Sequence, residues 1–180
     1  MLSGAVAPLD SVLVFDDHGG HQAPSCAEFL AGRGVRVELV TPDRQMGAEM
    51  GATNFPIHLR ELYRLGVKIT PDHRLTAVAR TDNQLRAVLL NVYTLREETR
   101  LVDQVVAEHG TLPRHQLYDA LKASSVNHGE LDLDALRDNR PQGRTTNPSG
   151  RFRLYRVGDA LASRNIHAAI YDSLRLAKDF

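Results

Sequence analysis

The sequence has 180 residues, of which 42% are hydrophobic and 24% charged, a composition typical of a folded globular protein. Lys plus Arg and Asp plus Glu both number 22, so the chain has no basic excess for binding a nucleic acid backbone. The single cysteine, Cys26, excludes an internal disulfide, a cysteine-rich zinc site and an iron–sulfur cluster within these residues.

The same features favour a cytoplasmic protein. Residues 1–8 contain no basic segment, and their apolar run is too short for a signal peptide. One cysteine suits a reducing compartment. No window approaches the roughly 18 apolar residues of a membrane span, so we expect no membrane partner. Because the chain has no basic excess, we expect no nucleic acid partner either.

The chain is predicted to begin with a βαβ unit. Four consecutive apolar residues in Ser11–Asp16 indicate a buried parallel strand, which a glycine-containing loop at 16–22 follows. A helix at 23–31 and a second strand at 35–40 complete the unit. This order of strand, glycine loop, helix and strand is how many nucleotide-binding α/β folds begin.

A second helix and a group of antiparallel strands are predicted next. The helix covers 55–65 and a short strand covers 67–70. Antiparallel strands are expected at 74–80, 85–92 and 97–101, with a turn at 81–84, and a buried strand at 102–107. The sequence therefore predicts an α/β fold, a Rossmann-like parallel sheet with a β-meander insertion, within residues 1–110.

The last part of the chain contains few predicted elements. They are a short helix after Pro113, an exposed loop at 137–150, a strand at 152–157 and a helix at 165–178. The helix carries an apolar stripe expected to be buried, formed by Ile166, Ala169, Ile170, Leu174 and Ala177. Because residues 111–180 are too few to bury a core alone, we expect this second region to need a partner, to expose apolar surface and to favour homo-oligomers.

Six segments together carry a family resemblance. They are residues 12–21, 27–31, 37–42, 102–110, 157–160 and 163–172, and they span most of the chain. In this order they resemble the pyridine nucleotide–disulfide reductase architecture. More closely, they resemble the C-terminal NAD/FAD-lobe portion of the trimethylamine dehydrogenase and 2,4-dienoyl-CoA reductase family of NADH:flavin oxidoreductases.

The resemblance implies an incomplete member of that family. In such enzymes an N-terminal barrel holds FMN and usually an iron–sulfur cluster, and the C-terminal half binds FAD or ADP and in some members NADPH. Residues 1–110 correspond to the NAD(P)-binding-like lobe, and residues 111–180 to the end of the FAD/ADP-binding lobe. We therefore expect part of a flavin-dependent oxidoreductase rather than a complete enzyme, with a flavin-barrel domain or subunit as its partner.

The Gly158-Asp159 pair is the centre of the predicted site. A glycine at the end of a strand lets a ligand approach the backbone, and a carboxylate beside it can accept hydrogen bonds from sugar hydroxyls. The helix that follows offers free N–H groups to a pyrophosphate. From the residues alone, a role as the cap of that helix is favoured for Asp159, and the resemblance reverses this preference. With the resemblance, the predicted FAD- or ADP-binding residues are Gly158, Asp159, Ala160, Arg164, Asn165, His167 and Gly110, and no catalytic residue is predicted.

The loop at 16–22 argues against NAD(P) binding. Gly19 and Gly20 are adjacent instead of spaced as in a dinucleotide fingerprint, and Asp16 brings negative charge towards a phosphate. The second strand ends in Thr41-Pro42, without the acidic residue that holds a ribose.

Two other functions remain open from the sequence. Asp16, Asp17, His18 and His21 have the chemistry of metal ligands, which would suit a small metal-dependent hydrolase. Alternatively, the chain could be a non-catalytic interaction or scaffold protein that kept the fold and lost the ligand. Cys26 is expected to be a buried structural thiol, and His109 either contacts a ligand or only ends its strand.

Overall fold

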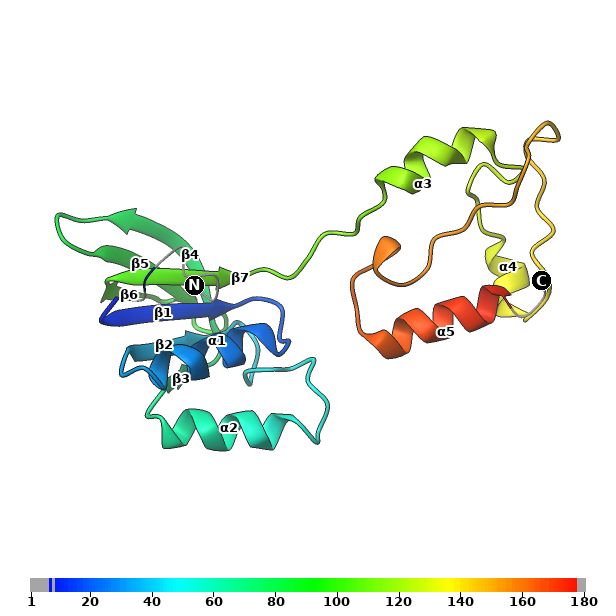
Figure 1. Ribbon diagram of the computed structural model, residues 1–180. Helices are drawn as coiled ribbons and strands as arrows, with labels where there is room; N and C mark the ends of the chain where they lie inside the picture. Colours follow the sequence, from blue (N-terminus) through cyan, green and yellow to red (C-terminus); the bar gives the residue numbers. More distant parts are fainter. Residues whose placement is uncertain (1–6, 8, 178–180) are drawn as a thin grey trace. The chain divides into compact units, whose positions relative to one another are not determined.

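A computed structural model describes residue 7 and residues 9–177 (Figure 1). Residues 1–6 and 8 of the opening segment, for which no signal peptide is expected, and Lys178, the expected end of the last helix, lie outside the described residues. The chain divides into two compact units, Met1–Gly110 and Thr111–Phe180. Within the described part, no helix is both long and apolar enough to cross a lipid bilayer.

A parallel sheet forms the centre of the first unit. Its four strands lie in the order β3-β2-β1-β7, which is the arrangement of a Rossmann-like fold. The strands are β1 (Ser11–Asp16), β2 (Arg36–Val40), β3 (Lys68–Thr70) and β7 (Gln104–Glu108), and the two helices are α1 (Gln22–Ala31) and α2 (Phe55–Arg64).

A second, antiparallel sheet is formed by β4 (His73–Arg80), β5 (Leu85–Asn91) and β6 (Glu97–Val102), in the order β4-β5-β6. This confirms the predicted β-meander. The predicted strand at 102–107 begins later than expected, because Asp103 separates β6 from β7 and its carboxylate accepts hydrogen bonds from the Ser11 backbone N–H and hydroxyl.

The two sheets and the helices make three layers. Val12 and Val14 of β1 pack in the core beside the helices, whereas Leu13 and Phe15 pack in a second core with residues of β5. Successive residues of a strand point to opposite faces, so β1 is buried on both sides. Its unbroken apolar run follows from that position between two layers (Figure 1).

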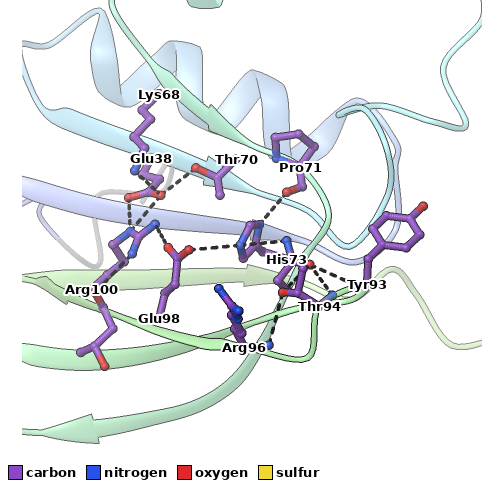
Figure 2. A network of polar contacts seen from close by, with 12 residues as sticks. Glu38, Lys68, Thr70, Pro71, His73, Tyr93, Thr94, Arg96, Glu98 and Arg100 are labelled. Carbon is purple, nitrogen blue, oxygen red and sulfur yellow. Dashed lines mark hydrogen bonds and ion pairs between the residues drawn. The ribbon is translucent and has the colours of Figure 1, made fainter.

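A half-buried polar network joins the two sheets (Figure 2). Glu38 Oε1 on β2 lies 2.9 Å from Lys68 Nζ and accepts a 2.7 Å hydrogen bond from the Thr70 hydroxyl. Arg100 Nε on β6 donates to Glu38 Oε2 at 3.1 Å, and its Nη2 lies 2.8 Å from Glu98 Oε2. Burial alone would raise the pKa of Glu38, but Lys68, Thr70 and Arg100 together hold it below its ordinary value.

The second unit consists of short helices joined by loops. They are α3 (Gln116–Leu121), α4 (Leu133–Arg137) and α5 (Ile166–Ala177), with 3₁₀ turns η1 (Lys122–Ser124) and η2 (Gly158–Ala160). The helix α4 was not predicted, since its five residues are too few to show a periodic pattern.

The prediction of a strand at 152–157 is wrong. Within the described residues this segment makes only an isolated parallel bridge, between Ser125 and Phe152, and no strand lies beside it to complete a ladder. The buried Asn127 side chain instead supplies the hydrogen bonds that a neighbouring strand would make with Leu154. Its Nδ2 donates to the Leu154 carbonyl at 2.8 Å and its Oδ1 accepts from the Leu154 N–H at 3.0 Å.

The prediction that the apolar stripe of α5 is buried is also wrong. Ile166 is 80% exposed, Ile170 55% and Leu174 62%. Among the described residues of this unit, Ala135 is the only fully buried hydrophobic side chain. The periodicity gave the helix correctly, but burial needs a surface to pack against. The exposed apolar surface expected of this region is therefore confirmed.

Candidate functional site

The candidate site is a cavity of about 670 Å³ in the second unit, where η2 and the start of α5 meet. Five of the residues selected from the sequence line it: Gly158, Asp159, Arg164, Asn165 and His167. The remaining lining residues are Val157, Ile166, Ala169 and Ser173. The fold thus gathers most of the predicted cofactor-binding residues at one place.

Gly158 allows η2 and α5 to approach closely. Its φ of 56° lies in the left-handed region, where glycine is favoured. A Cβ atom at this position would lie only 2.9 Å from the Ala169 Cβ, so a larger residue would push α5 away. The glycine therefore fixes the backbone wall of the cavity.

Asp172 holds the turn in place, and the sequence reasoning missed it. Its Oδ2 accepts a 3.3 Å hydrogen bond from the Gly158 N–H and pairs with the Arg164 guanidinium. Asp172 lies inside the segment that carries the family resemblance. The signal that could have found it is its spacing of three residues from Ala169, which places both side chains on one face of α5.

Asn165, rather than Asp159, caps α5. The Asn165 Oδ1 accepts a 2.9 Å hydrogen bond from the Ala168 N–H. The alternative that Asp159 is a helix cap is therefore wrong. The Asp159 side chain is exposed and forms no hydrogen bond or ion pair with any described residue.

The chemistry of the cavity is that of a site for a hydroxylated anion. The first N–H groups of α5 favour negative charge, and Arg164, although paired with Asp172, adds guanidinium N–H donors to the lining. The Asp159 carboxylate can accept hydrogen bonds from hydroxyl groups, and the His167 imidazole can donate or accept. These residues can supply contacts for a phosphate group and a sugar.

Two of the predicted site residues do not line this cavity. Ala160 belongs to η2 but is absent from the lining. Gly110 belongs to the first unit, where a Cβ would lie 2.9 Å from His18 Nδ1, so it packs against the loop at 16–22. His109 beside it lies 3.3 Å from the Asp17 carboxylate and makes an edge contact with Phe15.

The loop at 16–22 in the first unit is closed by the protein's own backbone. Asp16 is fully buried, and its Oδ1 accepts hydrogen bonds from the Gly19 and His18 N–H groups at 2.8 and 3.2 Å. Burial raises the pKa of Asp16. Gly19 contacts the next loop, since the Glu49 N–H donates to its carbonyl at 3.0 Å.

The metal-hydrolase hypothesis is not supported by this loop. Asp16 points into its own backbone, and within the described residues no three His, Cys, Asp or Glu side chains gather into a metal site. Cys26 is half-buried against the helix-side core, and burial raises the pKa of its thiol. A thiol in that state is a packing residue and not an activated nucleophile.

Comparison with known proteins finds close relatives, although no family model matches the chain. It is 46% identical over 179 residues to the probable N-methylproline demethylase of Rhizobium meliloti, covering 99% of this chain and 26% of that protein. It is also 46% identical over 184 residues to the N,N-dimethylglycine/sarcosine dehydrogenase of Chromohalobacter salexigens, covering 100% and 26%. The chain thus spans about a quarter of the length of these relatives.

Solved structures share the fold at lower identity. Histamine dehydrogenase from Rhizobium sp. 4-9 superimposes with a TM-score of 0.63 and 22% identity, covering 92% of this chain and 22% of that one. A 2-naphthoyl-CoA reductase superimposes with the same TM-score and 18% identity, covering 99% of this chain and 22% of that one.

Proposed function

This chain belongs, through a segment about a quarter as long as its relatives, to the trimethylamine dehydrogenase and 2,4-dienoyl-CoA reductase family of flavin oxidoreductases, and from that premise we propose that it binds the ADP portion of FAD, or ADP itself. Its role is that of a nucleotide-binding module of a larger flavin-dependent amine dehydrogenase, demethylase or enoyl reductase.

The observation that supports this role is the exposed, unpaired Asp159 carboxylate of η2, which lines the same cavity as Arg164 and the start of α5. The carboxylate would hold the sugar hydroxyls, and Arg164 with the helix N-terminus would hold the pyrophosphate. The absent Cβ of Gly158 lets α5 lie close against η2, so that the start of the helix lines the cavity. When bound, FAD supplies electron transfer through its flavin ring, while this chain only binds and orients the coenzyme.

The rest of the oxidoreductase is proposed to cover the second unit. The exposed Ile166, Ile170 and Leu174 on α5 form an apolar face of the kind that packs against another domain. A flavin-barrel domain or subunit is the proposed partner, in keeping with the quarter-length match to the relatives.

The first unit is proposed not to bind NAD(P). The loop that would face the pyrophosphate contains the buried Asp16 carboxylate and is covered by the segment around Glu49. The alternative function is a non-catalytic scaffold, in which the second unit would bind no nucleotide either.

A melting experiment separates the module from the scaffold. Millimolar ADP or FAD should raise the melting temperature of the chain by roughly 2–4 °C, as ligands that bind only the folded state do. Asp159→Ala should abolish the shift, and Asp82→Ala, which removes an exposed carboxylate of the β4–β5 turn, should keep it. No shift for the unsubstituted chain with either ligand, alone or with a barrel partner, would favour the scaffold.

A further inference from the structure

Two histidines of the first unit face each other across α1 and α2, away from the candidate site. His21 immediately precedes α1, and His58 lies in the first turns of α2. The His21 Nδ1 and the His58 Nε2 are 3.3 Å apart, and the two rings are tilted by 56° instead of stacked. One ring nitrogen of His21 thus lies against one ring nitrogen of His58.

The separation of these nitrogens fits a shared metal ion. At 3.3 Å the two nitrogens are close enough for one ring to donate a long hydrogen bond to the other, and the same separation suits two ligands of one ion. Two imidazole nitrogens on a tetrahedral zinc ion, each about 2.0–2.1 Å from the metal, are separated by about 3.3–3.4 Å. The observed 3.3 Å is the length of that edge.

Glu28 prepares His58 for such a role. Its Oε1 lies 2.7 Å from the His58 Nδ1, with side chains only 24% and 17% exposed respectively. A carboxylate on one ring nitrogen fixes the tautomer and leaves the other nitrogen free to bind a metal, as in the carboxylate–histidine–zinc arrangement. His21 is exposed, so an ion can reach the pair and water can complete its coordination.

We propose that His21 Nδ1 and His58 Nε2 bind a divalent transition-metal ion, Zn²⁺ or Cu²⁺, with Glu28 as the positioning residue. The ion would connect the start of α1 to α2. This site is independent of the proposed nucleotide site and shares only His21 with the aspartate-rich loop considered above. With two protein ligands, affinity should follow the order in which Cu²⁺ binds more tightly than Zn²⁺.

Calorimetric titration of the full chain with Zn²⁺ alone, in a non-chelating buffer, tests the site. One ion per chain should bind, and His21→Ala should weaken binding at least tenfold. His21 is the decisive variant because it is exposed and its side chain makes no capping hydrogen bond, so its loss should not unfold α1. Glu28→Gln should weaken binding by a factor of about ten, as loss of an outer carboxylate does.

The control is His115→Ala, which removes an exposed histidine paired with Asp119 in the second unit. It should leave Zn²⁺ affinity unchanged. With Cu²⁺, electron paramagnetic resonance should show coupling to two imidazole nitrogens, and to one in His21→Ala. The proposal is overturned if the unsubstituted chain binds neither ion, or if His21→Ala binds Zn²⁺ as well as the unsubstituted chain does.

Discussion

The two units of this chain use apolar residues in different ways. In the first, β1 is covered by helices on one side and by the meander on the other, and side chains such as Leu13 and Leu39 are fully buried. In the second, the largest helix presents Ile170 and Leu174 outward, and the buried positions are mainly polar. The first unit therefore has its own hydrophobic core. In the second unit, hydrogen bonds and tight turns hold the residues around the cavity in place, and the apolar face of α5 is exposed to solvent.

Truncation of a buried leucine should show the largest difference between the units. Leu39→Ala should lower the free energy of unfolding by about 2–5 kcal/mol, because it leaves a cavity beneath α1. Leu174→Ala, at an exposed position of α5, should change it by no more than about 0.5 kcal/mol. Urea unfolding followed by circular dichroism measures both, and equal losses would contradict the comparison.

A substitution at Gly158 should damage the second unit alone. Gly158→Ala places a Cβ against Ala169 and in a left-handed conformation, at a cost of about 1–3 kcal/mol. ADP affinity should fall at least tenfold in a binding titration. Gly34→Ala is the matched control for left-handed backbone, since no atom lies near its missing Cβ. Retained ADP binding in Gly158→Ala would show that the close approach of η2 and α5 is dispensable.

The link between the two sheets of the first unit should depend on pH. Glu38→Gln should destabilise the chain by about 1–2 kcal/mol at neutral pH. The loss is modest because Arg100 still forms its ion pair with Glu98. The folded pKa of Glu38 lies below its unfolded value of about 4.3, so its contribution is complete above that pH and is lost as the pH falls through the folded pKa. Urea unfolding at pH 7 and pH 3.5 should therefore show a difference that shrinks in acid.

The smallest effect concerns association through α5. Because its apolar face is exposed, the chain should self-associate at high concentration, and Ile170→Glu should reduce this with little change in stability. Sedimentation velocity at two concentrations measures the effect. Identical behaviour of the variant and the unsubstituted chain would place any association elsewhere.

The sequence predicted the first unit well because its signals are local. Each element is indicated by a pattern within its own segment: four apolar residues inside β1, glycines after α1, and alternating residues in the strands of the meander. That the meander forms a separate layer could not be predicted from alternation, which gives the faces of a strand but not its neighbours.

In the second unit, the errors have one physical cause. The alternating residues at 152–157 resemble a strand, yet a strand requires a partner, and here Asn127 binds that segment instead. The stripe of α5 was correctly periodic but is uncovered. For the site, four predicted polar or charged side chains come together. Asp172 shares a face of α5 with Ala169, but its hydrogen bond with Gly158 is visible only in the structure.

Addition of ADP to the isotopically labelled chain, followed by amide nuclear magnetic resonance, tests the central claim most directly. We expect the signals of Gly158, Arg164 and His167 to shift in a saturable manner, while those of Gly19 and Gly20 stay in place. Shifts confined to the loop at 16–22, or no shift in either unit, would contradict a coenzyme site at the start of α5.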